Sequence, residues 1–232
     1  HQVLLNSVSL ELRTPLTSII GNATALQDEK SVTNPESRQS LIHELILSTE
    51  RLNRIVDNLL DMSRINSGTL QLKKEWFDAR DLVEETASRL SRSLGQHPVV
   101  FDLGTKQIYL QGDYRLLDHA LTNLLLNAAA YSASDAQIKV ALQVKPREVF
   151  LSVIDQGQGI AKEEQHKIFD KFYRVPHSPA GGVGLGLSIV KSIVDLHEGQ
   201  VLVESAGLGQ GATFTMVLPL IEPPAELKDG LK

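Results

Sequence analysis

Two long runs of apolar residues at helical spacing occupy the N-terminal part of the chain, and they limit the possible folds more than any other feature. In the first run, between Val3 and Leu26, apolar residues recur three and four positions apart, as one buried helix stripe requires: Leu5, Val8, Leu12, Leu16 and Ile19. The polar stretch from Asp28 to Pro35 then reads as a turn. The second run keeps a near-heptad seam: Leu41, Leu45, Ser48, Leu52, Ile55, Leu59 and Met62. Together the runs predict an antiparallel helical hairpin.

A single hairpin cannot cover both apolar stripes. The second helix carries further apolar residues beside its seam: Ile42, Ile46, Val56 and Leu60. Pairing with a second hairpin in a four-helix bundle would bury this wide face. We therefore predict a homodimer held by residues 2 to 66.

After Ser67-Gly68 the pattern changes to an α+β organisation. Short β-like runs alternate with helical runs at Arg80–Leu94, Tyr114–Tyr131 and Gly184–Leu196, and the β-like runs are Val99–Leu103, Gln107–Leu110, Ile138–Val144, Val149–Ile154, Gln200–Glu204 and Thr213–Leu218. The last two runs predict a closing hairpin. We expect three parts: a helical hairpin at 1–68, an α+β domain at 69–222 and a flexible tail at 223–232.

Charge and composition exclude several classes of function. The net charge is −5 and the pI is about 5.8, so no basic field favours nucleic acid, and we predict protein or nucleotide partners. The absence of cysteine excludes disulfides and thiolate metal sites. No apolar run reaches the roughly 18 to 20 residues of a membrane span. The chain begins at His1 inside a helical pattern and without methionine, so we expect it to be part of a longer protein.

The first of four separated motifs lies on a helix, where Asn123 and Asn127 stand four residues apart on one face. Their amide oxygens suit a hard cation such as Mg²⁺. Two solvated polar residues would look the same. The second motif, Asp155-Gln-Gly157-Gln-Gly159-Ile160, follows a β-like run. Its carboxylate could accept from an adenine amino group while the glycines let backbone approach the base, although alone it also fits a plain turn.

The third motif, Ile168-Phe-Asp-Lys-Phe-Tyr-Arg174, interleaves aromatic residues with Lys171 and Arg174, which could meet phosphate oxygens. A helix end that packs two phenylalanines is the alternative. The fourth motif, the glycine-rich stretch from Gly181 to Ser188, precedes an apolar helix, and glycines there present bare N–H groups to phosphate. It is neither a Walker loop nor a Rossmann motif, because no Lys-Ser or Lys-Thr follows the glycines and the first β-like run lies far away.

In order and spacing these motifs resemble the N, G1, F and G2 boxes of the GHKL ATPases, and the histidine-kinase branch fits best. Upstream, Ser9-Leu-Glu-Leu-Arg-Thr-Pro-Leu16 is similar to the H-box Ser-His-Glu-Leu-Arg-Thr-Pro-Leu at every position except Leu10. The phrase Leu72-Lys-Lys-Glu-Trp76 also resembles the potassium-responsive Kdp-type sensor kinases. The resemblance covers residues 2 to about 220.

The resemblance implies a fold, a reaction and partners. The fold would be a dimeric four-helix bundle followed by an α/β sandwich of the GHKL type. The reaction would pass the γ-phosphate of ATP, with Mg²⁺, to a histidine and then to an aspartate on the receiver domain of a response regulator. The place would be the cytoplasmic portion of a membrane-anchored bacterial kinase. Glu11 would be the base beside the acceptor, and Thr14 would orient water for dephosphorylating the regulator.

The ATP site that the resemblance implies has Asn127 as the Mg²⁺ ligand, Asp155 as the reader of adenine, and Lys171 and Arg174 facing the phosphates. The remaining residues of this implied site are Asn123, Tyr131, Gly157, Gly159, Ile160, Gly182, Gly184, Leu185, Gly186, Leu187 and Thr213.

Two positions depart from the family pattern. Ala130 stands where the family commonly carries lysine, which removes one phosphate contact. Leu10 stands at the phosphoacceptor position, on the polar side of its helix, and leucine has no nucleophilic atom. We predict that this form binds ATP without autophosphorylation. Two alternative functions stay open. In the first, ATP only changes the geometry of the helix bundle. In the second, a GHKL enzyme hydrolyses ATP itself, but the Asn123–Asn127 helix has no clear glutamate to activate water.

Overall fold

The computed structural model describes residues 2–27, 34–175 and 184–224, and side chains within this part except those of residues 2–7 and 66. The chain divides into two compact units. The first contains the N-terminal helices to Thr69, and the second begins at Leu70 and contains both β-sheets. Each is described by itself.

The first unit is a hairpin of two helices, α1 (Gln2–Ala25) and α3 (Pro35–Asn66), which pack against each other. Asn34 caps α3 by accepting from the backbone N–H groups of Glu36 and Ser37, and Pro35 suits the first helical position because it has no N–H to satisfy. The hydroxyl of Ser48 donates to that of Ser18 at 2.9 Å across the hairpin. The predicted hairpin is confirmed, while most of its predicted turn, residues 28–33, lies outside the described residues.

Part of the apolar surface of this hairpin stays uncovered. Ile46, Val56 and Leu60 are exposed, as the wide face of the second helix predicts. Leu16, which the sequence places in the buried stripe of the first helix, is 48% exposed. Ser18 faces α3, and two residues along a helix turn the side chain by about 200°, so Leu16 points to the other side.

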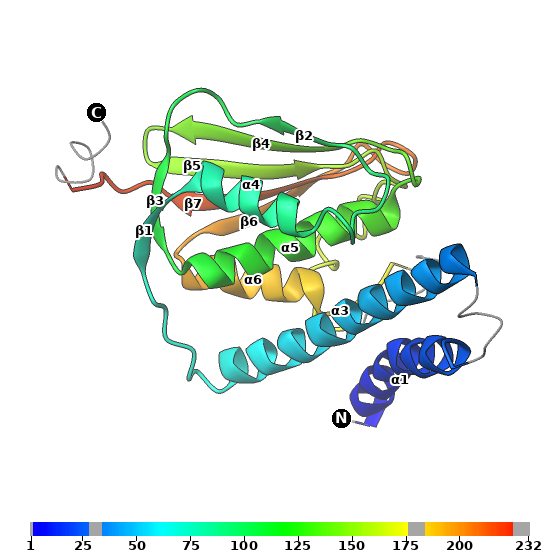
Figure 1. Cartoon of the computed structure of the whole chain (residues 1–232). Helices are drawn as coiled ribbons and strands as arrows, with labels where there is room; N and C mark the ends of the chain where they lie inside the picture. The colour runs from blue at the N-terminus through cyan, green and yellow to red at the C-terminus, as the bar shows by residue number, and fades with distance from the viewer. Residues whose placement is uncertain (1, 28–33, 176–183, 225–232) are drawn as a thin grey trace. The chain divides into compact units, whose positions relative to one another are not determined.

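The second unit is built on a five-stranded sheet of order β2-β4-β5-β7-β6, in which only β2 and β4 are parallel. The strands are β2 (Val99–Asp102), β4 (Ile138–Lys145), β5 (Glu148–Ile154), β6 (Gln200–Glu204) and β7 (Thr213–Pro219). Helices α5 (Tyr114–Tyr131) and α6 (Gly186–Leu196) pack on one face of this sheet (Figure 1). Alternate residues of β5 point into this core: Val149, Leu151 and Val153.

Two helices of this unit have an aspartate as their N-terminal cap. Asp113 caps α5 through Leu116 N–H at 3.1 Å, and Asp78 caps α4 (Ala79–Arg89) through Arg80 N–H at 2.9 Å. A second, two-stranded antiparallel sheet pairs β1 (Glu75–Asp78) with β3 (Tyr109–Gly112). Strand β1 was not predicted from the sequence, and the predicted helix Arg80–Leu94 ends five residues past the observed end of α4.

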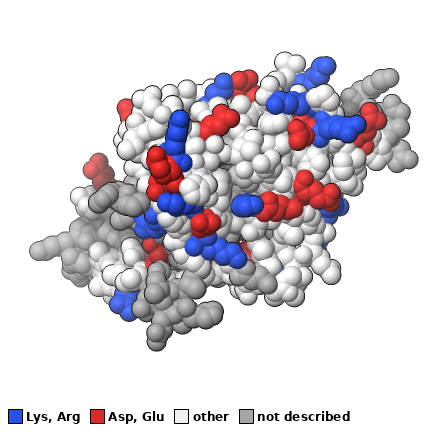
Figure 2. All heavy atoms as spheres, turned by 180° about the vertical axis from the view of Figure 1, so that it is seen from behind, with Lys and Arg blue, Asp and Glu red and all other residues white. Residues whose placement is uncertain are grey.

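Within the described ranges, no helix combines the length and the apolar character that crossing a bilayer requires. On the face seen in Figure 2, acidic and basic side chains are interspersed, so this face carries no broad basic field.

Candidate functional site

A pocket opens between the C-terminal half of α5, the loop after β5, the segment that follows this loop, the first turn of α6 and the start of β7. Seven residues that the sequence assigns to the ATP site line this pocket: Asn127, Tyr131, Asp155, Gly159, Ile160, Arg174 and Leu187. They come from all four motifs. The fold therefore brings segments that lie up to 60 positions apart in the sequence to one place.

Asp155 is held by backbone donors. Its Oδ1 atom accepts from Gly157 N–H at 2.8 Å and from Ala212 N–H at 3.1 Å. Burial raises the pKa of this carboxyl above the usual aspartate range, and the two N–H donors oppose the rise because they favour the charged form. Both hydrogen bonds use the same oxygen, so the carboxylate is oriented with Oδ2 directed away from them.

Gly157 shows how closely this loop approaches α5. A Cβ atom at Gly157 would lie 2.4 Å from the carbonyl oxygen of Tyr131, closer than any side chain tolerates. The backbone N–H of Gln158 donates to the same carbonyl at 3.0 Å. The glycine therefore lets the loop lie against the end of α5, beside the pocket.

Asn123 supports the start of α6 rather than the pocket wall. Its Nδ2 donates to the carbonyl of His119 at 3.2 Å, and a Cβ at Gly186 would lie 3.3 Å from its Oδ1. Asn127, one turn later on α5, lines the pocket itself. An amide oxygen at this place, beside a ligand with phosphate oxygens, provides the hard donor that Mg²⁺ prefers.

Several predicted residues lie elsewhere. Lys171 is exposed, Gly184 has a left-handed φ of 74°, and Leu185 precedes α6; none of the three lines the pocket. Gly182 lies outside the described residues. Thr213 lines a different hollow, together with Ile154, whereas its neighbour Phe214 lines this pocket and Ala212 contributes to both. The cause is strand alternation, since consecutive residues of β7 face opposite sides.

The pocket also contains residues that the sequence analysis did not assign to it: Gln158, Ile168, Tyr173, Val175, Ala212 and Phe214. Ile168, Tyr173 and Gln158 lie within the motifs quoted above. Their residue types alone gave no reason to assign them to the ATP site. Phe214 packs edge to face on Phe169, with ring centroids 6.5 Å apart, and so connects the third motif to β7. Because the two rings lie far apart in the sequence, no local pattern reveals this contact.

The second predicted centre lies on the helical hairpin. The Leu10 side chain is 64% exposed, and the carbonyl of Leu10 accepts from the Thr14 hydroxyl at 3.2 Å. Glu11 is turned inward, with a side chain 15% exposed and its Oε2 atom 3.7 Å from the guanidinium of Arg51. An aliphatic side chain therefore faces solvent at the position that the sequence predicts as the phosphoacceptor, while the Glu11 side chain next to it in the chain is turned toward Arg51.

Comparison with known proteins finds two domain families in the chain. Residues 2–68 match the family described as His Kinase A (phospho-acceptor) domain, and residues 112–222 match the histidine kinase-, DNA gyrase B-, and HSP90-like ATPase family. The Sensor protein KdpD of Escherichia coli strain K12 is 39% identical over 222 residues, which cover 94% of this chain but only 24% of that protein.

Solved structures agree with the sequence relatives. The Acinetobacter baumannii histidine kinase AdeS superposes with a TM-score of 0.65 at 27% identity, covering 91% of this chain and 98% of that one. The mycobacterial sensor histidine kinase MprB is 31% identical, with a TM-score of 0.57, and the match covers 62% of this chain and 97% of that chain. With both domain families matched in order and relatives aligned over most of its length, the chain belongs to the sensor histidine kinases and contains their phosphoacceptor and ATPase domains, similar to the Kdp-type kinases.

Proposed function

We propose that this chain is a histidine-kinase core that binds Mg-ATP at residues 69–222 but cannot phosphorylate itself on the hairpin at residues 1–68. The observation that carries the proposal is the exposed Leu10 at the acceptor position, with Glu11 and Thr14 retained around it. Phosphoryl transfer depends on positioning and charge neutralisation, which an intact ATP site supplies. Neither effect can replace an absent nucleophile.

The side chains at the pocket fit the binding of Mg-ATP. The carboxylate of Asp155 would accept a hydrogen bond from the adenine amino group, and Tyr131 would line the base pocket. Asn127 would hold Mg²⁺ through its amide oxygen, with Asn123 one turn away. Mg²⁺ would neutralise phosphate charge when bound. Arg174, from the pocket wall, and Lys171 would meet the phosphates, and the glycines Gly184 and Gly186 would present backbone N–H groups to them.

The partners belong to the same proposal. The exposed apolar residues of α3 would be buried in a homodimer, and the receiver domain of a response regulator would be the second protein partner. The chain would be the cytoplasmic portion of a membrane-anchored sensor, with a potassium-linked signal suggested by the Kdp-type relatives. No role in nucleic-acid binding is proposed.

The experiment is incubation with γ-labelled ATP of the chain as it stands, of Leu10→His and of Thr17→His. Thr17→His is the matched control because it adds a histidine at another exposed position of α1. We expect acid-labile label only on Leu10→His. Label on the unchanged chain, at His1 or His43, would overturn the proposal, and an inert Leu10→His that still binds ATP would show that the acceptor alignment is misplaced.

The alternative is a regulator phosphatase without kinase activity, which the retained Thr14 and Glu11 favour. It predicts that the chain accelerates the loss of phosphate from a phosphorylated receiver domain and that Thr14→Ala abolishes this acceleration. If neither kinase nor phosphatase activity is measured, ATP would serve only to change bundle geometry.

A further inference from the structure

The loop that carries Asp155 is held by a second loop, residues 205–212, which connects β6 to β7. Backbone hydrogen bonds join the two loops along their length: Asp155 N–H to Ala212 O at 2.9 Å, Gly211 N–H to Gly157 O at 3.1 Å and Gly209 N–H to Gln158 O at 2.6 Å. The approach is close. A Cβ at Gly159 would lie 2.0 Å from the carbonyl oxygen of Gly207.

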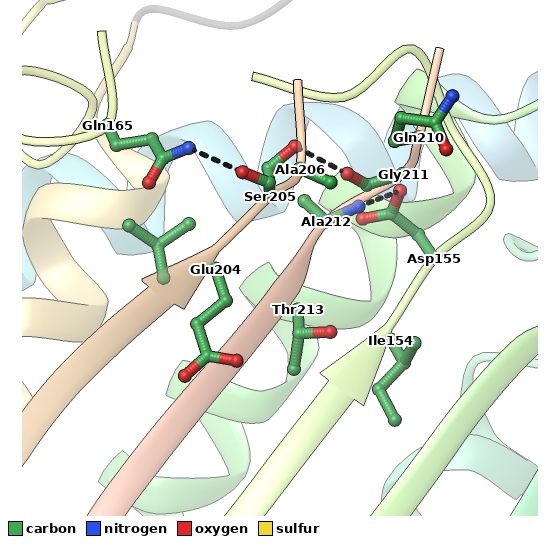
Figure 3. A pocket seen from close by; sticks show the side chains of 11 residues that line it. Ile154, Asp155, Gln165, Glu204, Ser205, Ala206, Gln210, Gly211, Ala212 and Thr213 are labelled. Atoms are coloured by element: carbon green, nitrogen blue, oxygen red, sulfur yellow. Dashed lines mark hydrogen bonds between the residues drawn. The ribbon is translucent and has the colours of Figure 1, made fainter. Parts of the chain in front are cut away.

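The Ser205 hydroxyl makes hydrogen bonds to both loops, and Figure 3 shows the one to Gly211. Its hydroxyl accepts from Ile160 N–H at 2.9 Å, at the end of the Asp155 loop, and donates to Gly211 O at 2.7 Å, next to Ala212. The side-chain amide of Gln165 also contacts both loops: its Nε2 donates to Ser205 O at 2.9 Å and to Ile160 O at 3.2 Å. These contacts fix Ala212, whose N–H orients the Asp155 carboxylate.

An open hollow of about 490 Å³ lies on the other side of these loops, and Asp155, Gln165, Ser205 and Gly211 contribute to its wall. The side chains of the described residues leave this space unfilled. Hydrogen bonds, rather than side-chain packing, therefore hold the Asp155 loop on this side.

We propose that Ser205, assisted by Gln165, is a positioning residue that sets the preference of this site for adenine over guanine nucleotides. This inference rests on the proposed ATP site. Asp155 accepts from the amino group of adenine and repels the carbonyl oxygen that guanine carries at the same place, so discrimination depends on where the carboxylate points. Ser205 controls that direction through Gly211 and Ala212 without touching the base.

The test measures the dissociation constants of Mg-ATP and Mg-GTP by calorimetry for wild type, Ser205→Ala, Ser205→Thr and Ser152→Ala. Ser152→Ala is the control, because the Ser152 hydroxyl also makes a hydrogen-bond contact, to Thr215 at 2.8 Å, but lies within the sheet and outside the two loops. We expect Ser205→Ala to weaken ATP binding about tenfold, because it removes the hydroxyl that Ile160 N–H and Gly211 O use to hold the loops, and to leave GTP binding nearly unchanged. Ser205→Thr, which keeps the hydroxyl, should restore the ATP to GTP ratio, and Ser152→Ala should not alter it.

The outcomes separate this inference from the proposed function. If wild type binds no ATP, the ATP site itself is wrong and the inference falls with it. If wild type binds ATP and Ser205→Ala keeps the wild-type ratio, only the positioning role is overturned. Should Ser205→Ala lose its cooperative thermal transition, Gln165→Met provides the second variant, and an unchanged ratio in it would overturn the role equally.

Discussion

The Nε2 atom of His197 accepts a hydrogen bond from the backbone N–H of Asp113 at 2.9 Å, while its Nδ1 atom contacts the carbonyl of Ile193 at 2.7 Å. This buried histidine, which directly follows α6, thus contacts Asp113, the residue that caps α5. The pairing requires the neutral tautomer with its proton on Nδ1, because a protonated ring would direct a second N–H at the Asp113 N–H.

His197 should make stability depend on pH. Burial lowers its pKa below the usual histidine value, so the unfolded chain binds the proton more readily than the folded one. The stabilising contribution of neutral His197 to the free energy of unfolding is therefore complete above about pH 6.5 and declines as the pH falls below it. Thermal unfolding of wild type and His197→Ala between pH 8 and pH 5 checks this: the variant should be less stable at pH 8 by about 1 to 3 kcal/mol and should lose stability less steeply in acid. His166→Ala, at an exposed position, should keep the wild-type slope.

Asp155→Asn should separate binding from folding. The asparagine oxygen can still accept from Gly157 and Ala212, and the substitution removes a buried charge, so the thermal midpoint at neutral pH should be at least that of wild type. The amide NH₂ would then face the adenine amino group, donor against donor. Thermal shift with Mg-ATP should therefore vanish in Asp155→Asn and persist in Asp102→Asn, an exposed carboxylate paired with Lys139. An undiminished shift in Asp155→Asn would refute the assigned role.

Glu11 should act as a base only when an acceptor is restored. In the Leu10→His background, Glu11→Gln should slow label incorporation by about 10² to 10⁴, the usual range for removal of a general base. Glu44→Gln, on the exposed side of α3, is the control and should leave the rate unchanged. Equal rates for Glu11→Gln and its parent would exclude the proposed role.

The uncovered face of α3 should mediate dimerisation. Val56 is 42% exposed in the isolated chain, so glutamate there adds charge without disturbing the contacts between α1 and α3. We expect Val56→Glu to be monomeric by light scattering at micromolar concentration, while wild type and His43→Glu, a change on the polar side of the helix, stay dimeric. A monomeric wild type, or a dimeric Val56→Glu, would contradict the four-helix arrangement.

Elements whose limits are encoded locally could be predicted from the sequence. The predicted helix Tyr114–Tyr131 and strand Gln200–Glu204 have the observed bounds, and Asp113 provides the cap that starts the former. Strand β1 could not be predicted, because Glu75–Asp78 is four residues long and gains its partner from residues 109–112. Its stability comes from that distant pairing and not from its own pattern.

The same limit applies to the candidate site. The motifs indicated Asp155, Asn127 and Tyr131 from residue type and spacing. Thr213 could not be distinguished from Ala212 and Phe214, because which residues of a strand face the helices depends on its register with β5. Ser205 and Gln165 belong to no motif, and only their hydrogen bonds to Ile160 and to each other reveal them.

The contact between Asp155 and Ala212 joins residues 57 positions apart, and strand β7 lies between β5 and β6 in the sheet. During synthesis, a chain that has emerged only as far as α6 would therefore carry the asparagines and Asp155 without the Ala212 N–H, one of the two backbone donors that orient the carboxylate. Such long-range pairing forms late, after loop closure has been overcome. Nucleotide would then bind completely folded domains in preference to incomplete ones. Cellular ATP would stabilise the completed domain through mass action and would not stabilise truncated products.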